Sequence, residues 1–227
     1  MLLMATMGEE TNFVISTDDE RIVYLRSKDA RLNKLVLKIG DIRCGRHENL
    51  FQFVVGEIIE QMLSIKVADI LRDRFSALCE GDVCPEKVLA LSVEQIRSIG
   101  VSKSKASFIH NYAQATADGV VCYDALSQLP DEEILKALTS IKGIGTWTAK
   151  MALIFVFERE NILPYEDVAF LQGYKWLYNT SEVHKKFVIQ KCKKWSPYAS
   201  LAARYLYRAV DMGLTKSQFH LFKEWED

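Results

Sequence analysis

The chain has 227 residues, and 49 % of them are hydrophobic, so it can bury a substantial core as one large domain or two small ones. Its 29 Lys and Arg residues nearly balance its 30 Asp and Glu residues. The resulting net charge of −1 argues weakly against nucleic-acid binding, because proteins that neutralise phosphates usually carry a basic excess.

Five scattered cysteines argue against a structural zinc site and against a secreted disulfide framework, because they form no CxxC pair and lie near no histidine cluster. A reducing cytosol fits this pattern best. The opening MLLMATMGEE is not typical of a signal peptide, and no apolar run approaches the roughly 18 residues of a membrane span. The cysteines are Cys44, Cys79, Cys84, Cys122 and Cys192.

The predicted elements are almost all helices joined by short polar turns, which indicates an all-α fold of about eight to ten helices. Only residues 11–26 hint at extended structure, and residues 1–27 are expected to be an N-terminal extension that precedes a domain over 28–227. Apolar residues at helical spacing predict helices at 29–39, 50–63, 67–75, 103–117 and 131–141.

Capping residues mark several helix ends. Ser92 and Gln95 have the spacing of a capping box, and Gly100 ends the short helix that follows them. Ser196 and Pro197 are predicted to be the N-cap and first position of a helix that includes Tyr205.

Basic residues cluster in two places. Lys103 and Lys105 lie close together, and a longer stretch contains Lys185, Lys186, Lys191, Lys193 and Lys194. Each cluster taken alone is interpreted as a solvated helix face.

The most informative stretch is residues 138–150, where one helix runs through Lys142, Gly143, Ile144 and Gly145 directly into a second helix. The two glycines permit a turn too tight for side chains, and Ile144 can fill the gap between the helices. Backbone N–H groups at the start of the second helix could then approach a phosphate closely, without adding to the charge count. A GxG between helices taken alone would indicate only a tight turn.

The residues that follow this hairpin extend the pattern. IKGIGTWTAKMALIFVF is followed by LPYEDVAFLQG, in which Asp167 lies six residues before Gly173. In type, order and spacing the chain resembles the helix-hairpin-helix (HhH-GPD) superfamily of DNA glycosylases, 3-methyladenine DNA glycosylase II branch. The resemblance covers about residues 28–212. It implies two helical subdomains enclosing a cleft, and a DNA-binding hairpin at Gly143, Ile144, Gly145, Thr146 and Thr148.

By this resemblance Asp167 is the catalytic carboxylate. Breaking an N-glycosidic bond builds positive charge on the sugar, which a nearby carboxylate stabilises while it orients the attacking water. The alternative is that Asp167 merely caps the next helix. Where lyase members of the superfamily carry a lysine that forms a Schiff base, this chain has Trp147. A monofunctional, water-using glycosylase without lyase activity is therefore predicted.

Other site residues also follow from the resemblance. Gln61, Met62 and Leu63 are candidates for the wedge that fills the space left by a flipped nucleotide, with Met62 preferred, although Glu60 stands where the family usually has a small residue. Trp147 and Trp195 are predicted to line the base pocket by stacking on a cationic base. Met62 and both tryptophans could instead belong to the core.

No required cofactor and no iron–sulfur cluster are expected, since a four-cysteine cluster is missing near the C-terminus. The family's hairpin often holds Na⁺ or K⁺, here at the backbone carbonyls of Thr139, Ile141 and Gly143. The four histidines belong to no recognisable ligand motif; they are His47, His110, His184 and His220.

The predicted function is removal of alkylated purines such as 3-methyladenine from double-stranded DNA containing a damaged base, as a monomer with no membrane partner. The cytoplasm is expected for a bacterial protein and the nucleus for a eukaryotic one. Two alternatives stay open: a glycosylase for deaminated or oxidised bases, and a non-catalytic DNA-binding module.

Overall fold

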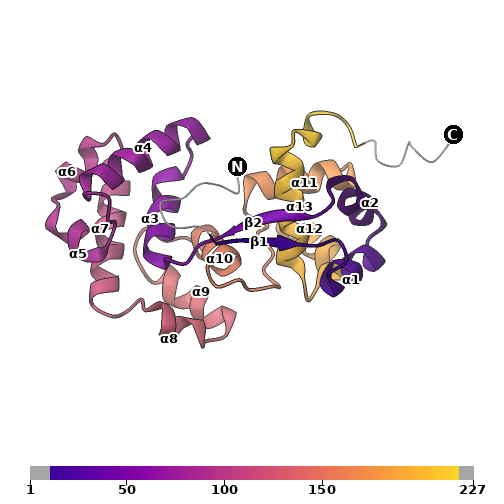
Figure 1. Ribbon diagram of the computed structural model, residues 1–227, viewed down its shortest axis with the longest axis horizontal. Helices are drawn as coiled ribbons and strands as arrows, with labels where there is room; N and C mark the ends of the chain where they lie inside the picture. Colours follow the sequence, from indigo (N-terminus) through magenta and orange to yellow (C-terminus); the bar gives the residue numbers. More distant parts are fainter. Residues whose placement is uncertain (1–10, 220–227) are drawn as a thin grey trace. The chain divides into compact units, whose positions relative to one another are not determined.

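The computed structural model describes residues 11–219 and has an all-α fold, as predicted, with one small sheet (Figure 1). Residues 1–10 and 220–227, with His220, lie outside the described part. The sheet pairs β1 (Thr11–Ile15) antiparallel to β2 (Ile42–Arg46). The sequence pattern indicated extended structure only near β1 and did not reveal β2.

The chain divides into two compact units. The first, which we call the terminal unit, contains residues 11–46 and 159–219 of the described part, and the second, the central unit, contains residues 47–158. Residues 11–27, expected to be an extension, are an integral part of the terminal unit, because Ile15, Ile22 and Leu25 are buried in its core.

In the terminal unit, α13 packs against α11 and α2. Gly173 of α11 allows the close approach, since a Cβ there would lie 2.9 Å from the Leu206 Cβ on α13. The α-helices of this unit are α1 (Glu20–Lys28), α2 (Ala30–Ile39), α11 (Val168–Tyr178), α12 (Lys185–Cys192) and α13 (Ala199–Asp211), with 3-10 turns η1 (Lys193–Trp195) and η2 (Leu214–Lys216).

The predicted start of the last long helix is wrong. The helix α13 begins at Ala199 with Tyr198 as its N-cap, so Pro197 is not its first residue. Ser196 instead follows η1, and its side-chain oxygen accepts a hydrogen bond from Asn161 Nδ2 at 3.2 Å.

In the central unit, the mostly buried α3 packs against α4, α7 and α10. Residues 11–219 contain thirteen α-helices, more than the eight to ten expected, because helices of five or six residues are too short to show an apolar period. The helices of this unit are α3 (Leu50–Glu60), α4 (Ile65–Leu78), α5 (Pro85–Ala90), α6 (Val93–Ser98), α7 (Lys103–Ala117), α8 (Tyr123–Ser127), α9 (Asp131–Thr139) and α10 (Thr146–Phe155).

Local signals located several helix ends correctly. The capping box at α6 is present, since the Ser92 side chain accepts from Gln95 N and the Gln95 side chain accepts from Ser92 N. The bounds of α7 are those predicted. Within residues 11–219, the helices lack the combined length and hydropathy that crossing a bilayer requires.

Candidate functional site

The hairpin between α9 and α10 depends on Gly143. Its φ of +111° lies in a region that side chains disfavour, and a Cβ there would lie 2.3 Å from Phe108 Cγ of α7. Ile144 is 4 % exposed, so it fills the space beneath the turn as predicted. Gly143 is therefore required by the fold itself.

Gly145 differs from Gly143. Its φ of −90° and ψ of 172° suit any residue, and a Cβ there would meet no atom within 4 Å. The prediction that both glycines are needed for the tight turn is therefore wrong for Gly145. Its missing side chain instead leaves the space in front of the helix open.

The N-terminus of α10 has the features of an anion site. Gly145 is its N-cap, no side chain caps the helix, and both Gly145 and Thr146 are exposed. The first N–H groups of an α-helix have no acceptor within the helix, and the helix dipole places positive charge there. Such an end can hold a phosphate.

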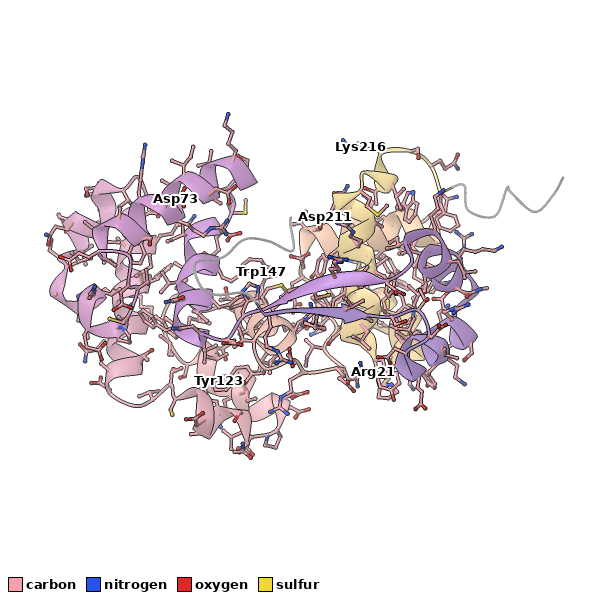
Figure 2. All side chains as sticks on the ribbon, viewed as in Figure 1. Arg21, Asp73, Tyr123, Trp147, Asp211 and Lys216 are labelled. Atoms are coloured by element: carbon pink, nitrogen blue, oxygen red, sulfur yellow. The ribbon has the colours of Figure 1, made fainter. Side chains whose placement is uncertain are left out.

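The next two residues of α10 differ in exposure. Trp147 is half-buried in the first turn (Figure 2). Thr148, predicted to contact DNA, is only 1 % exposed, and its Oγ1 accepts a hydrogen bond from Gln61 Nε2 at 3.3 Å. Its side chain therefore joins α10 to the α3–α4 turn rather than facing a ligand.

The α3–α4 turn exposes Met62 more than any of its neighbours. Met62 is 101 % exposed and has a left-handed φ of 61°, whereas Leu63 is 38 % exposed. A non-glycine residue in this conformation costs about 1–3 kcal/mol and persists only where the surrounding structure holds it there. The core interpretation of Met62 is excluded by its exposure.

Lys105 of α7 holds this turn. Its Nζ donates to the carbonyl oxygens of Ile59, at 2.8 Å, and Gln61, at 2.6 Å, and burial lowers the pKa of this ammonium group. In sequence Lys105 was only part of a basic cluster. No local signal could identify its partners, which lie 46 and 44 residues away.

Glu60 also faces inward. It pairs with Arg72 of α4, which is 7 % exposed and also pairs with Asp69. The acidic side chain at the family's small-residue position is thus neutralised within the central unit.

The candidate carboxylate belongs to the terminal unit. Asp167 is 3 % exposed and is the N-cap of α11, where its Oδ1 accepts a hydrogen bond from Phe170 N at 2.7 Å. The dipole of α11 favours a negative charge at this position. Asp167 therefore caps α11, as the alternative interpretation predicted, and this role is compatible with a chemical role.

The loop before Asp167 is fixed to α13. The Ser200 hydroxyl donates to the Arg159 carbonyl at 2.6 Å and accepts from Ile162 N at 2.9 Å. Closer to the carboxylate, Asp167 N donates to the Pro164 carbonyl at 3.0 Å. These bonds restrict the backbone that carries Asp167.

Trp195 does not match its predicted place in a base pocket. It is fully buried, its Nε1 donates to Asp29 Oδ2 at 2.9 Å, and its ring stacks on Tyr178 at 6.2 Å between centroids. Because no part of the indole is exposed, the structure supports the core interpretation of Trp195.

The carbonyls predicted to hold a cation lie at the C-terminal end of α9. The Ile141 carbonyl accepts one hydrogen bond, from Ile144 N at 3.0 Å. Among residues 11–219, no main-chain N–H outside the helices donates to the carbonyls of Thr139 or Gly143. The carbonyl of Ile141 is thus already used within the turn, and the cation site stays a prediction.

The central unit thus brings together the hairpin, Trp147 and the α3–α4 turn, through the bond between Gln61 and Thr148. Asp167 and Trp195 belong to the terminal unit.

A model of the HhH-GPD superfamily base excision DNA repair protein matches residues 55–197. A crystal structure of DNA-3-methyladenine glycosidase from Bacillus halodurans is 31 % identical, with a TM-score of 0.83, and the match covers 95 % of this chain and all of that one. The structure of a Schizosaccharomyces pombe 3-methyladenine DNA glycosylase in complex with abasic DNA is 27 % identical, with a TM-score of 0.78, over 85 % of this chain and 97 % of that one. DNA-3-methyladenine glycosylase 1 of the same yeast is 27 % identical over 88 % of this chain and 91 % of its own length.

Proposed function

Because the chain belongs to the HhH-GPD superfamily of base excision DNA repair proteins, we propose that it is a monofunctional DNA glycosylase. Its substrate is an alkylated purine of the 3-methyladenine type in duplex DNA, and its product is an abasic site. The observation that carries this proposal is Asp167, a buried carboxylate at the N-terminus of α11 in a loop of the family's pattern. The relatives named for 3-methyladenine support the substrate class.

The hairpin grips the DNA backbone in this proposal. A phosphate oxygen accepts hydrogen bonds from N–H groups at the uncapped start of α10, over the open space at Gly145. A Na⁺ or K⁺ ion held by the carbonyls of Thr139, Ile141 and Gly143 would add positive charge beside that phosphate. Main-chain dipoles explain how a chain of net charge −1 binds a polyanion.

Met62 acts as the wedge when the damaged nucleotide leaves the stack. An exposed, unbranched apolar side chain can enter between base pairs and offset part of the few kcal/mol that flipping costs. Trp147 offers its half-buried ring to the flipped base, and a cationic base is favoured over a neutral one.

The chemical step breaks the bond between C1′ and the base nitrogen. The base leaves with the bonding electrons, so an alkylated base that began as a cation departs neutral. Asp167 stabilises the positive charge that develops on the sugar, water adds to C1′, and the water proton passes to the carboxylate or to solvent. Trp147 cannot form an imine with C1′, so the DNA backbone stays intact.

Free-base release from methylated duplex DNA tests this function. The wild-type protein should release alkylated purines under single-turnover conditions, and strand breaks should appear only after alkali cleaves the abasic sites. Asp167→Asn should lower the release rate by about 100-fold or more, the range for removing a key electrostatic group. Because asparagine is also a good N-cap, the variant should stay folded and keep its DNA affinity.

Measuring the release of alkylated, deaminated and oxidised bases, each placed in the same duplex, determines the substrate class. Release only of a deaminated or oxidised base would replace the proposed substrate. DNA binding without release of any base would contradict a glycosylase, and strand breaks without alkali would contradict the monofunctional assignment.

A further inference from the structure

The helix α12 of the terminal unit is exposed over most of its surface. Only Val188 and Cys192 of its eight residues are buried, and Trp195 of η1 continues that buried line. A helix held by one narrow stripe leaves the rest of its circumference available to a partner.

This exposed surface is strongly basic. Residues 183–198 contain five lysines and no Asp or Glu. Lys194 turns inward, with its Nζ 3.0 Å from Asp29 Oδ2, and Lys191 Nζ lies 4.9 Å from the centre of the Tyr178 ring. Within residues 11–219, by contrast, the exposed ammonium groups of Lys186 and Lys193 form no ion pair.

The two exposed lysines lie on the same side. Successive residues are rotated by about 100° in an α-helix and about 120° in a 3-10 turn. Lys186 and Gln190 of α12, and Lys193 at the start of η1, therefore lie opposite the buried line of Val188 and Cys192. At a rise of about 1.5 Å per residue, Lys186 and Lys193 are roughly 10 Å apart along the axis, comparable to phosphates three steps apart on one strand at about 3.4 Å per step.

One end of α12 touches the loop that carries Asp167. The Nζ of Lys185 lies 4.8 Å from the centre of the Tyr165 ring, two residues before Asp167. A hydrogen bond to Tyr165 and the nearby Glu166 carboxylate raise the pKa of Lys185. The basic surface therefore begins beside the candidate carboxylate within the terminal unit.

We propose that the α12 surface, defined as Lys185, Lys186, Gln190 and Lys193, binds phosphates of the duplex DNA that the enzyme repairs. This second contact with the DNA rests on the proposed function for the identity of its ligand. The lysines supply the sequence-independent attraction that the near-zero net charge of the whole chain conceals.

The arrangement fits DNA better than an anionic membrane. Membrane-surface helices gather their apolar residues on one broad face. Here the exposed Phe187 and Ile189 lie on opposite flanks of the line formed by Lys186, Gln190 and Lys193, so no continuous apolar face exists on α12. A line of polar side chains with an apolar residue on either side suits the phosphates of a DNA strand better than a membrane surface.

The salt dependence of DNA affinity tests the proposal. The dissociation constant of the double variant Lys186→Gln with Lys193→Gln is measured on an undamaged duplex between about 50 and 200 mM salt. The logarithm of the association constant falls linearly with the logarithm of the salt concentration, and loss of two phosphate contacts should make this slope shallower by about 1.8. It should also weaken binding roughly tenfold or more at the lowest salt. Base release is compared at DNA concentrations that saturate each protein, so that the change in affinity does not enter the rate.

A matched control is the double variant Lys38→Gln with Lys216→Gln, which removes the same charge from exposed lysines of α2 and η2 in the same unit. Lys216 is labelled in Figure 2. It should retain the wild-type slope. If both double variants share one slope and one affinity, the α12 surface does not bind DNA. Lysine-dependent binding to vesicles of phosphatidylserine, with an unchanged DNA slope, would likewise overturn the proposal.

Base release measured on the same preparations separates the two proposals. A lysine-dependent slope without release of any base would support the α12 surface and reject the glycosylase. Normal base release with an unchanged salt slope would support the glycosylase and reject DNA binding by the α12 surface.

Discussion

Asp167 owes its position to the helix that it begins. Its Oδ1 accepts from Phe170 N, while Ser200 fixes the chain segment that precedes the carboxylate. The side chain is almost fully buried, so the field it exerts is less screened than at an exposed site. A helix cap and a stabiliser of positive charge are compatible roles, because one carboxylate has several acceptor positions.

Met62 has the opposite arrangement: its side chain is exposed, whereas hydrogen bonds hold the turn that carries it. Gln61 bonds to Thr148 below the turn, and Lys105 bonds to the carbonyls of Ile59 and Gln61. These contacts impose the left-handed conformation of Met62 and aim it outward.

Met62→Ala should therefore leave the free energy of unfolding within about 0.5 kcal/mol of wild type, as for most exposed substitutions. Base release from duplex DNA should fall by roughly tenfold, the equivalent of about 1.4 kcal/mol of lost support for flipping. Release from single-stranded DNA, which needs no wedge, should change little. Val120→Ala, an exposed apolar residue of the same unit, is the control; an equal loss on both substrates would remove Met62 from the flipping step.

The hairpin uses its two glycines differently. Gly143 adopts a backbone conformation that alanine resists and lies against Phe108, whereas Gly145 has ordinary torsion angles and open space before it. The first glycine therefore serves the packing of the hairpin turn against Phe108 of α7, and the second keeps the start of α10 accessible.

Alanine at each position should separate these effects. Gly143→Ala should destabilise the protein by about 2–4 kcal/mol through backbone strain and overpacking. Gly145→Ala should unfold at the wild-type denaturant concentration but bind DNA more weakly, because a methyl group would enter the space that a phosphate needs. Urea unfolding and DNA titration measure the two quantities. Wild-type DNA affinity in Gly145→Ala would contradict the phosphate site.

The terminal unit is assembled from both ends of the described chain, and Asp29 joins them. Its Oδ1 caps α2 through the N–H groups of Arg31 and Leu32, while its Oδ2 accepts from Tyr178, Trp195 and Lys194. Burial by itself would raise the pKa of Asp29, but the hydrogen bonds from these partners outweigh burial and hold the pKa below its usual value. Burial likewise raises the pKa of Tyr178, so the phenol remains a donor.

A pH dependence of stability follows from that lowered pKa. A group whose pKa is lower in the folded state stabilises the fold above its unfolded pKa of about 3.9, and this contribution is lost as pH falls through the folded pKa. At pH 7, Asp29→Asn should lower the free energy of unfolding by about 2 kcal/mol or more, the range for hydrogen bonds to a charged group. The difference in this free energy between variant and wild type, measured by urea unfolding, should shrink below about pH 4. An equal difference at both pH values would mean that the charge of Asp29 contributes nothing.

Interactions between near neighbours in the chain were predictable from residue type. Apolar spacing located α7, the Ser92–Gln95 capping box located α6, and the GxG motif located the hairpin, because helix period and capping depend on residues within a few positions of one another. Asp167 could be proposed as the candidate carboxylate because the stretch that resembles the family motif is continuous in the chain.

Burial and partner choice required the folded chain. Whether Trp195 faces a ligand or the core depends on Asp29, 166 residues earlier, and the shape of the α3–α4 turn depends on Lys105 more than 40 residues later. Likewise, the backbone torsion angles and the position of Phe108 distinguish the role of Gly143 from that of Gly145. Local sequence specifies which helices form and where they start, but contacts between distant residues determine which side chains remain exposed to meet DNA.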